Sequence, residues 1–279
     1  MKFKLGSGRK NFRAMSAGGG GGSGGGRPAA TANWLILGGC GFLGRNFVKY
    51  LLDNGLAASV RVADKRHPLM CALSADHKAA LLNRDLVELL QVDLAEDEGI
   101  DRAFAPPRGG GGWDFVVNLA AETAHGKPAE FYERGVACAG KAAAAAVAAA
   151  AAGAPVKRFI QVSSAFVYKP ESSGSAEGAG EGARVEPWTE PARACARAED
   201  AARTAAGLPL VVLRPATVYG PGDVAGLMPR CVVAATYKAD GAKMEMLWDG
   251  TLKVSTVHVF DVVRAIYFAA KKAPVGSGA

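Results

Sequence analysis

Apolar runs alternate along the chain with segments in which apolar residues recur at helical spacing. The first run, residues 34–37, is wholly apolar and ends in glycines, as a buried parallel strand does. Apolar residues then recur with the period of a helix up to Asn54 and Gly55, which predict its end. The same reading predicts strands at residues 59–63, 89–92, 114–118, 158–162 and 208–213, and helices at 128–152, 190–206 and 260–271. Strands that alternate with helices predict an α/β fold with a doubly wound parallel sheet.

A glycine-rich turn joins the first predicted strand to the first predicted helix. Gly38, Gly41 and Gly44 have the spacing GxxGxxG, and Phe42 and Leu43 lie inside it. Glycines permit a tight turn and let backbone N–H groups approach a pyrophosphate at the positive end of a helix. The triple alone is weak evidence in a chain with 36 glycines. With a strand before it, a helix after it and an acid about twenty residues later, it predicts a Rossmann-type dinucleotide site.

The acid is Asp64, at the end of the second predicted strand. A carboxylate there accepts hydrogen bonds from the adenosine ribose hydroxyls and repels a 2′-phosphate, which favours NAD over NADP. Lys65 and Arg66 follow directly and could accept that phosphate, so NADP stays open as the alternative. Asp64 could also be a solvated acid at a strand end.

The charge of the chain is concentrated in its first residues. The formal net charge is +7, but six basic residues and no acid lie in residues 1–31, which are rich in glycine and predict a disordered tail. The remainder of the chain is close to neutral. It has no basic patch with interleaved aromatic residues, so we do not expect a nucleic-acid partner. The tail could be an organelle transit peptide, so we expect a location in the cytoplasm or in an organelle matrix.

The cysteines and the longest apolar run exclude other classes of protein. Five scattered cysteines without a CxxC pair indicate a reducing compartment and predict no metal site. The run at residues 142–152 is almost pure alanine and too short to cross a bilayer about 30 Å thick. We therefore expect a soluble protein without a membrane span.

Five further motifs, in this order and at these separations, resemble the extended short-chain dehydrogenase/reductase family, especially its NAD-dependent epimerase/dehydratase branch. They are Asp93-Leu94, Asn118-Leu119-Ala120-Ala121, Leu213-Arg214-Pro215, Val218-Tyr219-Gly220-Pro221-Gly222, and Val257-His258-Val259 with Asp261-Val262. The resemblance implies adenine contacts from Asp93 and Leu94, and close approach of the cofactor to Leu119, Ala120, Ala121 and Pro215. It implies an NAD(P)-binding Rossmann domain at residues 32–219 and a small substrate lobe at 220–279, shorter than the family's usual lobe.

The residues that carry chemistry in this family are only partly present. Family enzymes transfer a hydride with a tyrosine base, a lysine four residues later that lowers the pKa of the tyrosine, and a serine or threonine. Ser164 matches the hydroxyl, although it could also cap the strand end. Neither tyrosine nor lysine occurs between Lys169 and Tyr219, and Cys195 falls near the position of the lysine. The chain thus lacks the base together with the group that tunes it; Glu122 is a weak candidate for a replacement.

Two functions remain open on this sequence. The first is hydride-transfer chemistry on a nucleotide-sugar or related hydroxyl substrate, with Ser164 orienting the oxygen and an unidentified base. The second is a non-catalytic structural or accessory role, because the dinucleotide-binding accessory subunit of respiratory complex I resembles the same family and also lacks the tyrosine–lysine pair. The helices after the fourth and fifth strands form dimers in many family members, so a homodimer is a further hypothesis.

Overall fold

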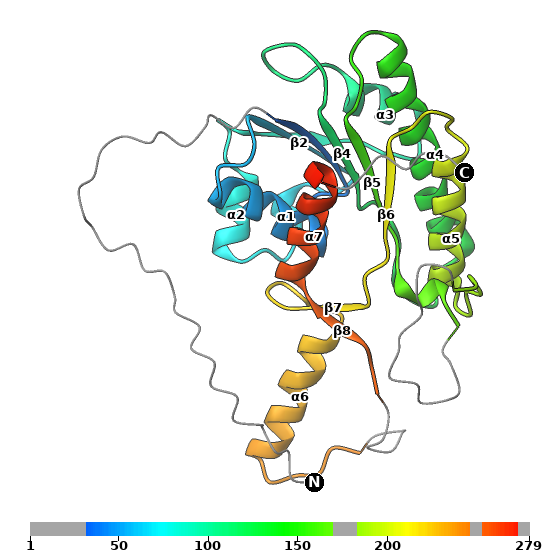
Figure 1. Cartoon of the computed structure of the whole chain (residues 1–279). Coiled ribbons are helices and arrows are strands. Elements are labelled where there is room, and N and C mark those ends of the chain that lie inside the picture. The colour runs from blue at the N-terminus through cyan, green and yellow to red at the C-terminus, as the bar shows by residue number, and fades with distance from the viewer. Residues whose placement is uncertain (1–31, 170–182, 246–252, 273–279) are drawn as a thin grey trace.

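Figure 1 shows a six-stranded parallel sheet in the computed structural model, which describes residues 32–169, 183–245 and 253–272. The strand order is β3-β2-β1-β4-β5-β6. The strands are β1 (Asn33–Leu37), β2 (Ser59–Asp64), β3 (Val87–Gln91), β4 (Phe115–Asn118), β5 (Arg158–Val162) and β6 (Leu210–Leu213). This order confirms the predicted doubly wound Rossmann fold. The predicted tail at residues 1–31 lies outside the described residues.

Helices cover both faces of the sheet. On one side lie α1 (Phe42–Asp53), α2 (Ala75–Leu81) and α7 (Val259–Lys272), and on the other lie α3 (Asp97–Phe104), α4 (Ala129–Ala151) and α5 (Glu190–Arg203). Beyond the carboxyl edge of the sheet lie β7 (Thr217–Tyr219), β8 (Thr256–His258) and α6 (Leu227–Ala239). Two short 3-10 helices, η1 (Pro68–Met70) and η2 (Ala165–Val167), follow β2 and β5.

The side chains of β1 show why its sequence is uniformly apolar. Trp34 and Ile36 pack on one face of the sheet with residues of α1 and α7, whereas Leu35 and Leu37 pack on the other face with residues of α3 and α4. All four side chains are fully buried. A parallel strand covered on both faces needs apolar residues at every position, not at alternate ones.

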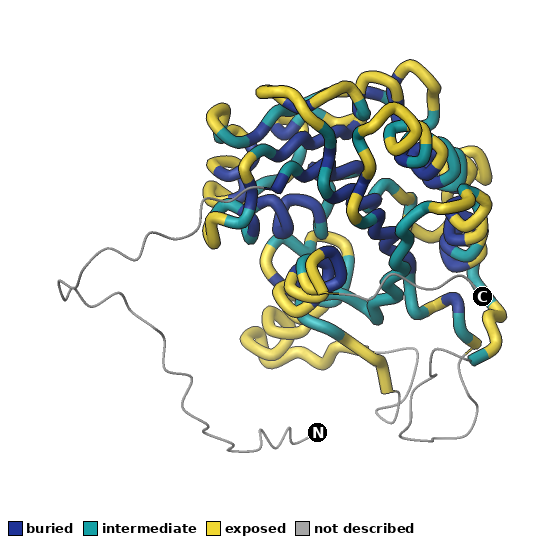
Figure 2. The backbone as a smooth tube through the Cα atoms, turned by 45° about the horizontal axis from the view of Figure 1, so that its top comes forward, coloured by how far each residue is buried: buried dark blue, intermediate teal, exposed yellow. Residues whose placement is uncertain are grey.

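The C-terminal elements divide between the core and the surface. Helix α7 packs against α1, and Val263 and Ile266 belong to the same core cluster as Trp34. Helix α6 has no buried residue, and Figure 2 shows its exposed course beyond the sheet. The sequence reading did not predict α2, α3 or α6, because short or weakly amphipathic helices give little periodic signal.

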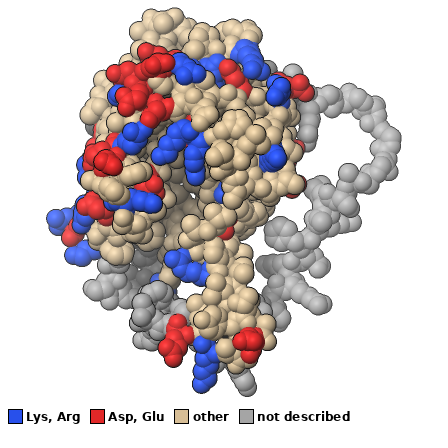
Figure 3. Space-filling model, turned by 180° about the vertical axis from the view of Figure 1, so that it is seen from behind, with Lys and Arg blue, Asp and Glu red and all other residues tan. Residues whose placement is uncertain are grey.

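None of the helices in the described ranges combines the length and the apolar character that crossing a membrane requires. Acidic and basic side chains are intermixed on the upper part of the face shown in Figure 3. Ion pairs also join neighbouring helices, such as Arg197 of α5 with Glu133 of α4 at 2.6 Å and Lys141 of α4 with Asp97 of α3 at 2.8 Å.

Candidate functional site

The turn between β1 and α1 is tight because its glycines touch neighbouring backbone. Gly38 has a φ of +78°, and a Cβ there would lie 2.8 Å from the backbone of Ala120. A Cβ on Gly44 would collide with the backbone of Gly39, whereas one on Gly41 would meet only the carbonyl oxygen of Gly38, at 3.2 Å. The fold itself therefore requires Gly38 and Gly44, while Gly41 borders open space.

The N-terminus of α1 is free to receive an anion. No side chain caps the helix, and its first turn has no acidic residue. The first N–H groups of a helix lack intrahelical partners and carry partial positive charge. Phe42, Leu43 and Gly44 supply these groups, so the turn has the features of a phosphate-binding site.

Asp64, at the end of β2, is tied to the glycine turn. Its buried carboxylate accepts hydrogen bonds from the backbone N–H of Cys40 and of Arg66, both at 2.9 Å. The N–H of Gly38 donates to the carbonyl of Ala63 at 2.8 Å. These bonds bring the predicted ribose-binding acid to the predicted phosphate turn.

A recess opens between the ends of β2 and β3, next to this acid. Cys40, Asp64, Arg66 and Gln91 contribute to its walls. Burial, together with the nearby carboxylate of Asp64, raises the pKa of the Cys40 thiol to about 12. The thiol thus stays neutral and presents an apolar surface to any group that enters the recess.

The two residues predicted to contact adenine differ in their environments. Asp93 lies two residues beyond β3, and its carboxylate forms an ion pair with Arg134 of α4. Leu94 is buried in the core on the α3 side, so only its backbone faces the carboxyl edge of the sheet. Arg134 was missed by the sequence reading, because nothing in the pattern pairs residues that far apart.

The segment after β4 lies directly beside the glycine turn. Leu119 donates its N–H to the carbonyl of Leu37 at 2.9 Å, and Ala120 donates to the side-chain oxygen of Asn118 at 3.1 Å. The backbone of Ala120 is the group that Gly38 approaches, and Ala121 is exposed. Small side chains here keep the carboxyl edge of the sheet open.

Ser164 follows β5 at the same edge. Its Oγ accepts a hydrogen bond from the N–H of Phe166 at 3.2 Å and caps η2. The N–H of Ala165 donates to the carbonyl of Pro215 at 2.9 Å, which joins the segments after β5 and β6. The structure therefore brings Ser164 and Pro215 together, but it gives the hydroxyl a local capping role as well.

Helix α5 carries no tyrosine or lysine where the family has them. Cys195 falls near the position of the family's lysine, and Pro191 lies four residues earlier, the separation of the family's tyrosine from that lysine; both residues are buried. Burial and the charge of Glu199 raise the pKa of the Cys195 thiol to about 11, which makes it a poor base near neutral pH.

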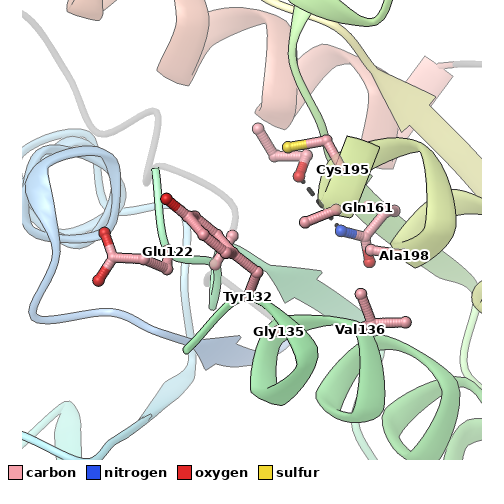
Figure 4. Close-up of a pocket in the computed structure, with 10 residues that line it drawn as sticks. Glu122, Tyr132, Gly135, Val136, Gln161, Cys195 and Ala198 are labelled. Atoms are coloured by element: carbon pink, nitrogen blue, oxygen red, sulfur yellow. Dashed lines mark hydrogen bonds between the residues drawn. The ribbon is translucent and has the colours of Figure 1, made fainter. Parts of the chain in front are cut away.

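Figure 4 shows the recess beside Cys195, which also has Glu122, Tyr132 and Gln161 in its lining. The carboxylate of Glu122 points away from Cys195 and accepts a hydrogen bond from the N–H of Ala124 at 2.8 Å. The thiol of Cys195 and the carboxylate of Glu122 thus belong to the same recess but point in different directions.

A buried ion pair fixes α5 to the end of β6. Glu199 is 1% exposed and accepts hydrogen bonds from Arg214 at 2.8 Å and from Arg203 at 2.9 Å. Burial acts to raise the pKa of Glu199, but its interactions with Arg214, Ser163 and Arg203 outweigh burial and lower the pKa below its ordinary value. Arg214 also donates to the hydroxyl of Tyr168 at 2.5 Å, which holds this tyrosine in the same network.

A second polar cluster attaches the segment after β7 to α1. Arg45 donates to the carbonyl of Gly222 at 2.6 Å, and Asn46 donates to that of Pro221 at 3.0 Å. His77 of α2 contacts the amide oxygen of Asn46 at 3.1 Å. The sequence reading missed this cluster, because Arg45 and Asn46 read as polar positions on the exposed side of a helix.

The strand order, the uncapped glycine turn and the acid at the end of β2 define a Rossmann-type protein. The model of the NAD-dependent epimerase/dehydratase family matches residues 34–278. The chain belongs to this family, which confirms the resemblance found in its motifs.

Individual relatives agree with this assignment. The low-salt glycan biosynthesis protein Agl12 of Haloferax volcanii is 26% identical over 247 residues, which cover 87% of this chain and 74% of that protein. The crystal structure of a putative epimerase from Burkholderia cenocepacia has a TM-score of 0.69 at 26% identity, with 89% of this chain and 74% of that chain covered. The dTDP-glucose 4,6-dehydratase of Bacillus anthracis, solved with NAD, has a TM-score of 0.69 at 22% identity, with 88% and 74% covered, and shows likeness of fold.

Proposed function

We propose that this chain binds NAD along the carboxyl edge of its sheet. The observation that carries the proposal is the bond from the Cys40 N–H to the carboxylate of Asp64, which joins the ribose-binding acid to the phosphate turn. The pyrophosphate would lie at the N-terminus of α1 and the adenosine in the recess between β2 and β3. The nicotinamide would then extend past Ala120 towards Ser164.

The same geometry favours NAD over NADP. The carboxylate of Asp64 is buried, and a 2′-phosphate on a bound cofactor would lie next to it. Two negative charges in close contact away from water repel strongly. Lys65 and Arg66 are exposed, so their charges are screened by solvent. The name of the family and the NAD found in the Bacillus anthracis enzyme support the same cofactor.

Calorimetric titration of the purified protein with NAD and with NADP tests this proposal. We expect heat from NAD at micromolar concentration and an affinity for NADP that is lower by tenfold or more. Equal affinities would contradict the role of Asp64, and silence with both cofactors would contradict the proposed site.

The activity we propose is hydride transfer on a nucleotide sugar or a related hydroxyl substrate, with Ser164 orienting the reacting oxygen. Membership of the family and the glycan biosynthesis relative support this substrate class. When bound, NAD supplies the hydride acceptor. Ser164 lies at the end of β5, and its Oγ can donate to a substrate oxygen while it accepts from Phe166.

A specific observation favours a second candidate, a non-catalytic accessory role. Helix α5 carries the buried residues Pro191 and Cys195 where we expect the phenol of the family's tyrosine and the ammonium group of its lysine. Absorbance near 340 nm together with chromatography of the nucleotide sugars, both after incubation with NAD and a panel of nucleotide sugars, separates the two candidates. New absorbance or a converted sugar supports the enzyme, whereas neither signal from protein that still binds NAD supports the accessory role.

A variant in which the tyrosine–lysine pair is restored tests whether its absence is the reason for a lack of turnover. If the missing base alone prevents turnover, the double variant P191Y/C195K should convert a nucleotide sugar that the wild type leaves unchanged. The single variant C195K, which supplies the cation without the phenol, is the matched control. Thermal unfolding of both variants shows whether the lysine is accommodated in the recess beside position 195.

We also propose a homodimer through α4 and α5. The two helices pack closely within one chain, since a Cβ on Gly140 would lie 3.5 Å from the Cβ of Ala201. Their outer surface carries small exposed side chains such as Ala144 and Ala148, which permit close approach of a second copy.

A further inference from the structure

Two large aromatic side chains are exposed immediately beside Ser164. Phe166 is 44% exposed and Trp188 is 53% exposed, and their rings form an edge-to-face pair with centroids 6.5 Å apart. Phe166 is also the residue whose N–H donates to the Oγ of Ser164. The pair therefore borders the one hydroxyl that the proposed activity uses.

The backbone holds the two rings in place. An isolated antiparallel bridge joins Tyr168 to Val185, and the N–H of Glu186 donates to the carbonyl of Val167 at 2.9 Å. These contacts bring the segment that leads into α5 alongside η2. Trp188 and Phe166 meet across that junction, although 22 positions separate them in the chain.

The ring of Trp188 has no partner on the helix that follows it. Trp188 precedes Thr189, whose hydroxyl caps α5 by accepting from Ala192 at 3.3 Å. A residue at this position often packs against the fourth residue of the helix, but that residue is Arg193. Its guanidinium pairs with Glu190 and donates to the backbone carbonyl of Trp188 at 3.5 Å. Trp188 therefore lacks the usual intrahelical partner and keeps half of its surface in solvent.

We infer that Phe166 and Trp188 form a platform for the sugar ring of a nucleotide-sugar substrate. A pyranose has hydroxyls around its edge and an apolar C–H face, and an exposed aromatic ring is the surface that matches this face. A few polar groups beside aromatic walls are what a small-molecule site requires. Ser164 would contact a ring hydroxyl while the platform holds the C–H face.

This inference rests on the proposed function, because it assigns the substrate side of the same site. The α1 turn and Asp64 would hold NAD, and the platform would lie beyond the nicotinamide end of the bound cofactor. Loss of the platform should therefore leave NAD binding unchanged, and this separates the two claims in an experiment.

The test titrates NAD-loaded protein with UDP-glucose and, in parallel, with UDP. The wild type should bind UDP-glucose more tightly than UDP. F166A and W188A should each weaken UDP-glucose binding about fivefold to tenfold, the size of a typical aromatic contact, with little effect on UDP. W188F, which keeps a ring, should retain most of the affinity.

Trp188 also provides a direct signal. Trp34 and Trp113 are buried, and the fourth tryptophan, Trp248, lies outside the described residues and is present in both proteins. The part of the UDP-glucose-induced fluorescence change that comes from Trp188 should therefore appear as a difference between wild type and W188F. The control is F268A, which removes an exposed ring from α7 and should match the wild type in every titration.

Three outcomes overturn the inference. The first is that wild type, F166A and W188A bind UDP-glucose with equal affinity. The second is that the variants lose as much affinity for UDP as for UDP-glucose. The third is that NAD-loaded wild type fails to bind UDP-glucose. In each case NAD still binds, so the proposed cofactor site stands. Absence of NAD binding in the wild type would instead contradict the proposed function itself.

Discussion

At the scale of single residues, the positions of the α1 turn require glycine for two different physical reasons. Gly44 and Gly38 touch neighbouring backbone, so a Cβ on either would disturb the fold even without a ligand. Gly41 meets only one carbonyl oxygen, at 3.2 Å, and is half exposed. Its small size therefore matters chiefly to whatever approaches the N-terminus of α1.

This difference predicts opposite outcomes for two variants. G41V should lower NAD affinity by about a hundredfold, because the branched side chain blocks the pyrophosphate, while the melting temperature changes little. G44V should lower the melting temperature sharply, because its side chain collides with Gly39. Calorimetry with NAD and thermal unfolding measure the two effects, and undiminished NAD binding by G41V would argue against the site.

At the scale of elements, α5 is anchored by the charge of one buried residue. Glu199 faces Arg214 at the end of β6 and Arg203 one turn later on α5. Removal of one partner from a buried ion pair leaves the other without a counter-charge, which costs about 3 kcal/mol. The pair thus fixes the helix that carries Pro191 and Cys195 against the sheet.

E199Q should therefore lower the free energy of unfolding by about 3 kcal/mol at pH 7. The control E190Q removes an exposed partner of Arg193 and should change it by less than about 0.5 kcal/mol. Urea denaturation measures both values. A loss in E199Q no larger than in E190Q would contradict the anchoring role.

The stabilisation from Glu199 should also depend on pH in a defined direction. Its pKa is lowered in the folded state from an ordinary value of 4.5, so the carboxylate stabilises the fold above that pH. This contribution is lost as the pH falls below 4.5 and through the folded pKa. The difference in stability between wild type and E199Q should accordingly shrink on acidification, and a constant difference from pH 7 to pH 3 would contradict the assignment.

At the scale of the whole molecule, the C-terminal segment serves two structural purposes. Helix α7 completes the core over α1, whereas α6 extends from the carboxyl edge of the sheet with no buried residue (Figures 1 and 2). Of the predicted lobe at residues 220–279, α7 thus belongs to the core of the Rossmann domain. We propose that the part ahead of α7 acts as a small substrate lobe, connected to that domain through Arg45, Asn46 and the carbonyls after β7.

The dimer proposed through α4 and α5 also belongs to this scale. Light scattering at micromolar concentration should give twice the mass of one chain. A144R, which places a long cation on the outer surface of α4, should give a single-chain mass, whereas M70R at the exposed η1 should leave the dimer intact. A single-chain mass for the wild type would contradict the dimer.

The local pattern of the chain determined much of this protein. The apolar run of β1, the glycine triple and the position of Asp64 predicted the strand, the turn, the helix and the α/β alternation, and the fold confirms that alternation. These features could be predicted because each depends on residues close together in sequence, where backbone geometry and burial on both faces of a strand dictate the residue types.

Only the tertiary structure decided which distant residues meet. The pairing of Asp93 with Arg134, of Glu199 with Arg214, and of Phe166 with Trp188 joins segments whose separation carries no periodic signal. Charged and aromatic residues at such positions read as surface in the sequence, because burial and pairing arise when separate elements pack together. The sequence thus determined the scaffold and the phosphate turn, and the packing of α4, α5 and η2 determined what surrounds the candidate site.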